Sequence, residues 1–377
     1  MHACPVWVSL VQRMLSAFLF QRGFVDSSSE AKDNPRGVHG RGASSICAAM
    51  PKVQHSMKCL LPALAIAAVI VVLPGCATEG TVDPAIYTFD RGALPPADIA
   101  LNIPGLGPCT DNPDRTLYLN SQQPVTVLVH GCFGSSGLFR GLAQVLAFHG
   151  QQTVCFTYND RDSMMVSSAD LISALEQLAN RMADKHLTVI GYSQGALIAR
   201  KALVSDRPGS ITSDVSLRLV TVAGPFGGIA AAEPCGNALV RVLTLGLIVP
   251  MCQIATGDKW SEITSTSDFI LRPGQLHRQV HDYLKVVTDE RGACRKFVDG
   301  GCSKSDFSFS LEEQSLPLID RDPLTKIIEV KAGHVEIAGD KRVAPVKLIK
   351  IFQDNNILNQ TEPHRLTDLN RLLARLY

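Results

Sequence analysis

The amino-acid sequence has little charge and almost no imbalance of charge. Charged residues make up 19% of its 377 residues, and the formal net charge is +1. A chain this close to neutral lacks the basic surface that binds phosphate backbones, so we expect no nucleic-acid partner. The sequence also contains no H-E-x-x-H zinc motif, no P-loop and no C-x-x-C pair, and it implies no metal or organic cofactor. Hydrophobic residues reach 46%, which permits a sizeable core and excludes global disorder.

Cysteine, by contrast, is abundant, with 11 residues. Disulfide bonds persist in oxidising compartments, so this number favours an exported protein. Four of the 11 lie in or before a segment that has the features of a targeting signal, which leaves 7. Because 7 is odd, at least one thiol stays free if the others pair. The short separations make Cys235–Cys252 and Cys294–Cys302 the first candidates for pairing, and other connectivities stay open.

Residues 57–76 read MKCLLPALAIAAVIVVLPGC and follow the order of an export signal. Lys52 and Lys58 supply positive charge before an apolar run, 60–73, that is shorter than the roughly 20 residues a membrane span needs. The run ends in L-P-G-C, which resembles the lipobox of bacterial lipoproteins, where the cysteine, here Cys76, becomes acylated. Pro74 departs from the usual lipobox pattern. A transmembrane anchor and an uncleaved signal are the alternatives.

The lipoprotein interpretation divides the N-terminal part of the chain. In this interpretation residues 50–75 are a signal peptide. Residues 1–49 precede the true start of translation and are a non-native or disordered extension. The mature protein then begins at Cys76 and is held at a membrane by its acyl chains. By resemblance to the lipoproteins of Gram-negative bacteria, Ala77 after the cysteine favours the outer membrane, on its periplasmic side.

The mature sequence changes character at Pro124. Residues 76–123 are rich in Pro, Gly and Asp and predict a tether followed by short edge strands near 99–103 and 117–119. Beyond it, apolar runs alternate with helical spacing. We expect strands at 125–129, 153–158, 187–190, 217–223, 283–288 and 326–330, and helices at 138–148, 171–182, 194–203 and 344–352. This alternation predicts an α/β fold, a mostly parallel central sheet with helices on both faces, over 124–360, followed by a polar tail at 361–377.

The most specific motif is Gly191-Tyr-Ser193-Gln194-Gly195, which matches G-x-S-x-G between a predicted strand and a predicted helix. A serine at such a tight turn projects its hydroxyl, and the two glycines let the strand and the helix approach each other. The start of the helix directs amide groups toward a developing negative charge. The sequence therefore makes Ser193 a candidate nucleophile.

With this motif and the pair His130-Gly131 at the end of an earlier strand, the sequence resembles the α/β-hydrolase superfamily, and within it the bacterial lipases and esterases. The resemblance implies an oxyanion hole made by the backbone N–H groups of Cys132 and Gln194. It implies for His130 a structural role in holding the loop. Cys132 lies in that loop, where a backbone role is expected, with a disulfide to Cys155 as one option.

A serine needs an imidazole to accept its proton, and in this family the order along the chain is Ser, acid, His. His334 follows the last predicted strand in a short loop that contains glycine, where the family places its base. Asp289 is the first residue after the strand predicted at 283–288, and we expect it to be the acid, with Glu290 as the alternative. The weaker candidates are, for the base, His277, His281 and His364, and, for the acid, Asp268, Asp282, Asp299 and Asp320.

A long insertion, about 229–275, interrupts the alternation of strands and helices. It carries an apolar stretch at helical spacing between Cys235 and Cys252. The resemblance to lipases implies a helical lid, clasped by a disulfide, that binds acyl chains. The alternative is a buried helix of the core.

Taken together, the motifs predict a serine hydrolase that cleaves carboxylic esters, small or lipid, through an acyl-serine intermediate. The same three residues would also serve an acyltransferase or a thioesterase, which differ in the acceptor or the bond attacked. A lipoprotein that kept the fold as a non-catalytic binding module is the alternative from another class.

Overall fold

The computed structural model describes residues 92–205, 214–233 and 257–377, with positions 242, 244, 249, 252 and 253. The large described ranges belong to one compact unit, 81–377. The predicted N-terminal extension 1–49, signal peptide 50–75 and lipidation site Cys76 lie outside the described residues. Among the helices that the structure describes, none has the length and apolarity to cross a membrane.

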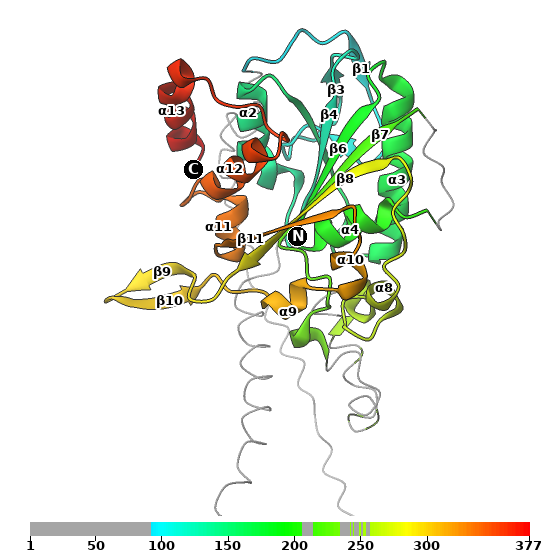
Figure 1. The fold of residues 1–377 in the computed structure, drawn as a ribbon, viewed down its shortest axis with the longest axis vertical. Helices are drawn as coiled ribbons and strands as arrows, with labels where there is room; N and C mark the ends of the chain where they lie inside the picture. Colours follow the sequence, from blue (N-terminus) through cyan, green and yellow to red (C-terminus); the bar gives the residue numbers. More distant parts are fainter. Residues whose placement is uncertain are drawn as a thin grey trace, which may run out of the picture. The chain divides into compact units, whose positions relative to one another are not determined.

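A central sheet of seven strands organises the described part of the chain (Figure 1). Its strands lie in the order β11-β8-β7-β6-β4-β5-β2, and all neighbours are parallel except β2 and β5. The bounds are β2 Leu106–Gly107, β4 Val125–Val129, β5 Gln152–Phe156, β6 His186–Tyr192, β7 Ser216–Val222, β8 Val280–Asp289 and β11 Thr325–Lys331. The expectation of a mostly parallel α/β sheet is therefore confirmed.

The apolar strands are explained by burial on both faces of the sheet. Successive side chains of a strand point to opposite faces, so a strand covered on both sides must be apolar throughout. In β4, Val127 and Val129 enter one core while Leu128 enters the other, and all three are fully buried. The two cores account for the continuous apolar runs in the sequence.

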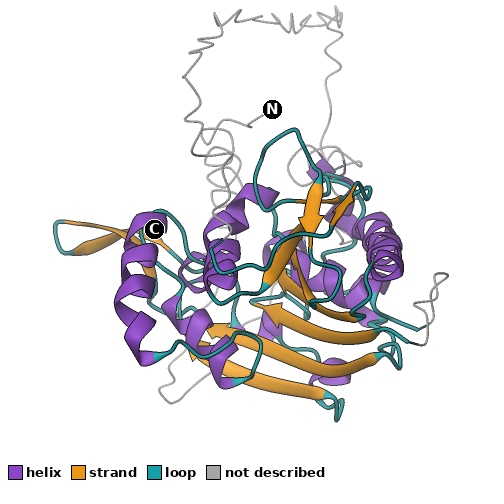
Figure 2. Cartoon of the chain, turned by 90° about the horizontal axis from the view of Figure 1, so that it is seen from above, coloured by secondary structure: helices purple, strands orange, loops and turns teal. Residues whose placement is uncertain are grey.

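Helices cover both faces of this sheet (Figure 2). The core on one side includes residues of α3 (Met164–Arg181) and α4 (Gln194–Ala202). The core on the other side includes residues of α2 (Arg140–Phe148) and α12 (Val346–Asp354). Ser163 begins α3 by accepting hydrogen bonds from the backbone N–H groups of Met165 and Val166, a favourable N-cap.

Several short elements complete the fold. The predicted edge strands form β1 (Ile99–Leu101) and β3 (Leu117–Leu119), which pair with each other in a separate antiparallel ribbon. The remaining short helices are η2 Ser136–Phe139, η3 Ala230–Ala232, η4 Asp258–Ser261, α8 Asp268–Leu271, α9 Leu311–Gln314, α10 Pro317–Asp320, α11 His334–Ala338 and η5 Pro363–Arg365.

The prediction of a polar tail at 361–377 is wrong. Residues Leu366–Leu376 form the helix α13, in red in Figure 1. Leu369 is buried in the same core as α2 and α12, and Leu373 and Leu376 pack against that core. Their spacing of four and three residues is that of one helix face, a signal present in the sequence.

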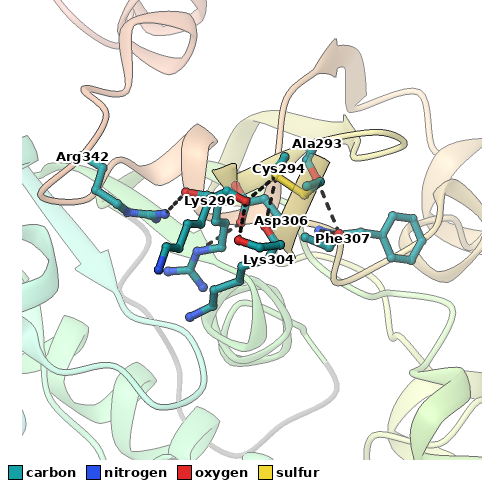
Figure 3. Close-up of a disulfide and its surroundings, with 11 residues drawn as sticks. Ala293, Cys294, Lys296, Lys304, Asp306, Phe307 and Arg342 are labelled. Carbon is teal, nitrogen blue, oxygen red and sulfur yellow. Dashed lines mark hydrogen bonds and ion pairs between the residues drawn. A yellow bond between two sulfur atoms is a disulfide. The ribbon is translucent and has the colours of Figure 1, made fainter. Parts of the chain in front are cut away.

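A disulfide-bonded hairpin follows β8. Strands β9 (Cys294–Val298) and β10 (Gly301–Ser305) pair antiparallel, and the predicted disulfide Cys294–Cys302 is confirmed (Figure 3). A two-stranded hairpin with exposed side chains is marginally stable alone. The disulfide therefore supplies a constraint that packing against the body does not.

The other predictions on cysteines and on the insertion have mixed outcomes. Cys155 pairs with Cys109, while Cys132 is a free thiol, so the suggested Cys132–Cys155 disulfide is wrong. Cys252 is disulfide-bonded. Cys235 and most of the apolar stretch between Cys235 and Cys252 lie outside the described residues, so the predicted lid at 229–275 and its clasp stay predictions.

Candidate active site

Ser193 lies at the sharp turn between β6 and α4. Its backbone adopts φ 56° and ψ −125°, a conformation that residues other than glycine rarely adopt. The Ser193 N–H donates to the carbonyl of Val222 at 2.9 Å, which fixes the turn to the neighbouring strand β7. The hydroxyl is thereby held at the carboxyl end of the parallel strands, where α/β folds place their ligands.

Glycines make this turn possible because other chain segments pass very close to them. A Cβ atom on Gly191 would lie 2.7 Å from the Cα of Ala196. A Cβ on Gly195 would lie 2.8 Å from the carbonyl carbon of Val129, on the adjacent strand. Such distances are shorter than side chains tolerate, and the obstructing atoms are backbone atoms that cannot rotate away.

We expect Gly195→Ala to destabilise the protein by at least about 2 kcal/mol, because the added methyl group overpacks a rigid backbone contact. Urea unfolding should show this as a lower midpoint with an unchanged slope. Gly301→Ala is the control, since its added Cβ would meet only the carbonyl of Val298, at 3.7 Å. Equal stability of the two variants would contradict the close approach.

His334 is the imidazole that meets the serine. It follows β11 and begins α11, and its Nε2 lies 3.1 Å from Ser193 Oγ. The residue is 7% exposed, with the ring of Phe309 against its ring edge-on at 4.8 Å. Tyr192 Oη donates to the His334 carbonyl at 2.8 Å, so the neighbour of the serine also holds the loop of the histidine.

Glu290 holds the other side of the imidazole. Its Oε1 lies 2.9 Å from His334 Nδ1 and accepts the Thr288 hydroxyl at 2.9 Å. Its Oε2 accepts the backbone N–H groups of Ser308, at 2.5 Å, and Phe309, at 2.9 Å. The residue is 1% exposed, and these donors compensate its carboxylate for the water it has lost.

The expectation that Asp289 contacts the imidazole is wrong. Asp289 is the last residue of β8, a strand that extends one residue beyond the predicted end, and its side chain leaves on the other side from Glu290. Its carboxylate accepts the Arg291 guanidinium at 2.7 and 2.9 Å and lies 3.5 Å from Lys331 Nζ. The Arg291 side chain holds the pKa of Asp289 well below its usual range.

Asp306 is a positioning residue that the sequence did not indicate. It follows the β9–β10 hairpin, and its carboxylate accepts the N–H groups of Val335, at 3.1 Å, and Glu336, at 3.0 Å. Its own carbonyl accepts the His334 N–H at 2.9 Å. A buried carboxylate thus satisfies the first turn of α11 and fixes the backbone of His334.

The two predicted oxyanion-hole residues lie beside the serine. Gln194 is the first residue of α4, a position whose N–H has no acceptor within a helix. Cys132 follows Gly131, where an added Cβ would lie 2.8 Å from the Ser193 Cβ. The next residue, Phe133, has φ 57°, and its N–H donates to Asp160 Oδ2 at 2.6 Å. Their role as donors stays a prediction.

His130 is buried, and its ring contacts Tyr158 and the Gly131 carbonyl. Its ring stacks on Tyr158 at 4.3 Å, and its Nδ1 lies 2.9 Å from the Gly131 carbonyl. Burial lowers the pKa of His130, which favours the neutral ring. The structural role expected for His130 stays a prediction.

The order of the serine, the carboxylate and the histidine along the chain is typical of one fold. The serine follows β6, the carboxylate follows β8 and the histidine follows β11, in a mostly parallel sheet. This is the arrangement of the α/β-hydrolase fold. Among the described residues, no three His, Cys, Asp or Glu side chains gather in a group that could hold a metal ion.

Comparison with protein-family models and with curated proteins finds no match. Among solved structures, the chain is similar to the mature lipase BlEst2 of Bacillus licheniformis, at 15% identity and TM-score 0.43, over 68% of this chain and 97% of that chain. A monoacylglycerol lipase of Paleococcus ferrophilus shares 16% identity at TM-score 0.40, over 62% and 95%. Esterase B of Lactobacillus rhamnosis shares 14% at TM-score 0.39, over 78% and 91%.

Proposed function

We propose that this protein is a serine hydrolase that cleaves carboxylic esters, with Ser193, His334 and Glu290 as its catalytic triad. One observation carries the proposal: two hydrogen-bond distances, 3.1 Å from Ser193 Oγ to His334 Nε2 and 2.9 Å from His334 Nδ1 to Glu290 Oε1, form one buried chain. That sequence of hydroxyl, imidazole and carboxylate turns a weak nucleophile into an effective one.

The geometry supports a two-step reaction. In the first step, Ser193 Oγ bonds to the ester carbonyl carbon while its proton passes to His334 Nε2. The carbonyl oxygen becomes an oxyanion, which the N–H groups of Cys132 and Gln194 stabilise. The tetrahedral intermediate then expels the alcohol, which takes the proton from Nε2. In the second step, water repeats the sequence, releases the acid and frees the serine.

Glu290 acts on the ring and not on the substrate. Its negative charge stabilises the imidazolium that forms when His334 holds the serine proton, and its hydrogen bond fixes the tautomer with Nε2 unprotonated at rest. Because the carboxylate has four hydrogen-bond partners, it can keep this charge in a site from which water is excluded.

An acyl-serine intermediate is tested by rapid mixing with p-nitrophenyl esters of increasing chain length. We expect a burst of p-nitrophenol that approaches one equivalent per Ser193 wherever hydrolysis of the acyl-enzyme is the slower step. The chain length that gives the highest kcat/KM identifies the preferred acyl group. Ester hydrolysis at an undiminished rate by a variant without the Ser193 hydroxyl would contradict the proposal.

The cellular setting is a further part of the proposal. We propose that export and acylation of Cys76 attach the enzyme to a membrane, at the outer membrane on its periplasmic side, where lipid esters are within reach. The support is the apolar run that ends in L-P-G-C. Metabolic labelling with a fatty acid should mark the wild-type protein and leave Cys76→Ser unmarked.

A further inference from the structure

A buried ammonium group lies beside the candidate oxyanion hole. Lys259 belongs to η4 and is 2% exposed. Its Nζ donates to Cys132 Sγ at 3.0 Å, to Gln194 Oε1 at 2.6 Å and to the carbonyl oxygen of Asp160. A lysine has three N–H donors, so these three acceptors use all of them.

The acceptors of Lys259 include the side chains of both residues that we propose as oxyanion-hole donors. Cys132 comes from the loop after β4, and Gln194 comes from the start of α4. These two segments follow the neighbouring strands β4 and β6 and meet at Ser193. A single ammonium group therefore bridges the two halves of the hole.

Both segments have backbone conformations that need support. Phe133, next to Cys132, has φ 57°, and Ser193, next to Gln194, has φ 56°. Non-glycine residues with such angles persist only where the surroundings hold them. Asp160 contributes on the Phe133 side, because its Oδ2 accepts the Phe133 N–H at 2.6 Å and lies 3.7 Å from Lys259 Nζ.

The segment that carries Lys259 is itself anchored to the body of the protein. Its Asp258 N–H donates to the Arg161 carbonyl at 2.7 Å, and its Glu262 carboxylate accepts the Ser163 hydroxyl at 2.6 Å and the Met164 N–H at 2.5 Å. These contacts hold η4 against the start of α3. The ammonium group is thus fixed by its own three acceptors and by the anchoring of η4.

We infer that Lys259 is a positioning residue for the oxyanion hole. By binding the side chains of both Cys132 and Gln194, it holds their backbone N–H groups so that they point to one place. This role rests on the proposed function. Donors fixed before the reaction need no reorganisation when charge develops, so their value depends on how firmly they are held. The positive charge also favours a nearby oxyanion in a site shielded from water.

The test compares Lys259→Met with wild type in two measurements. Methionine keeps the length of the side chain but can donate nothing, so the hole loosens while Ser193, His334 and Glu290 keep their contacts. We expect kcat for p-nitrophenyl butyrate to fall by about 10-fold to 100-fold, somewhat less than the loss of a whole donor, with KM changed by less than about twofold. The inhibition constant of a trifluoromethyl ketone, whose serine adduct carries an oxyanion, should rise by the same factor.

Lys285→Met is the matched control. Lys285 is also 2% exposed, pairs with a carboxylate, Asp320, and lies over the ring of Phe226 at 5.1 Å. Its loss should lower the thermal midpoint, because it leaves the Asp320 carboxylate without its ion-pair partner. It should leave kcat and the ketone inhibition constant near their wild-type values, which separates positioning from general stability.

Two further variants keep the inference open to contradiction. Lys259→Arg retains the charge and donors and should recover part of the ketone affinity, and Gln194→Met removes one acceptor while keeping its backbone N–H. If Lys259→Met does not fold, Gln194→Met is the substitute test. A rise in its ketone inhibition constant then supports the role of Lys259. An unchanged ketone affinity in every folded variant overturns the role of Lys259. A wild-type enzyme that neither hydrolyses esters nor binds the ketone overturns the proposed function instead.

Discussion

Replacing Ser193 by alanine is expected to lower kcat for a p-nitrophenyl ester by about 10⁶, to the level that the oxyanion hole and substrate binding alone provide. Alanine removes the only atom that bonds to the acyl group, while Cys132 and Gln194 keep their backbone N–H groups. KM should change little, because binding of the ester ahead of the reaction does not use the hydroxyl.

The measurement is steady-state kinetics with purified protein, combined with the burst amplitude, which should vanish. Ser173→Ala is the control: Ser173 is an exposed residue in the middle of α3, where alanine is a good helix former, so its activity should equal that of wild type. A Ser193→Ala protein with more than about one thousandth of wild-type kcat would show that another group performs the reaction.

Replacing Glu290 by glutamine is expected to lower kcat by about 10³ to 10⁴. Glutamine keeps the shape of the side chain but removes the charge that stabilises the imidazolium. Its amide must also turn an N–H₂ group toward His334 Nδ1 or toward the N–H groups of Ser308 and Phe309, which are donors themselves. In the first orientation His334 takes the wrong tautomer, and in the second an N–H₂ group faces two N–H donors.

The decisive comparison for the acid is Asp289→Asn, one residue earlier in the chain. Asp289 binds the exposed side chains of Arg291 and Lys331, so its change should leave kcat within about twofold of wild type. Ester hydrolysis by both variants, measured side by side, assigns the acid. A large loss for Asp289→Asn together with an active Glu290→Gln would reverse the assignment.

The sequence predicts the sheet well because its strands are buried on both faces. The bounds of β4 match the prediction, 125–129, and the turn that presents Ser193 lies where G-x-S-x-G indicates it. His334 follows from the same logic, since a histidine directly after the last parallel strand must lie at the same edge of the sheet as the serine. Burial of this kind leaves a clear apolar pattern.

The acid could not be chosen from the sequence because the choice depends on one residue. In a strand, neighbouring side chains point to opposite faces, so the end of β8 decides whether Asp289 or Glu290 turns toward His334. That strand end is set by pairing of Asp289 with Lys331 in β11, a tertiary contact. Element ends are the least reliable part of a prediction from sequence.

Lys259 and Asp306 were missed for a related reason. Each is a charged residue in an irregular segment, and its sequence neighbours give no periodic signal. Their contacts, to Cys132 and Gln194 in one case and to the first turn of α11 in the other, join segments more than 25 residues apart in the chain. Only the folded arrangement brings these groups together.

Labelling with a fluorophosphonate tests the central claim most directly, because this reagent bonds only to a serine hydroxyl activated by a neighbouring base. Incubation of the folded protein, followed by peptide mass mapping, should find a single phosphonylated residue, Ser193, and labelling should disappear in His334→Ala. Folded wild-type protein that stays unlabelled, or that carries the label on another serine, would contradict the triad.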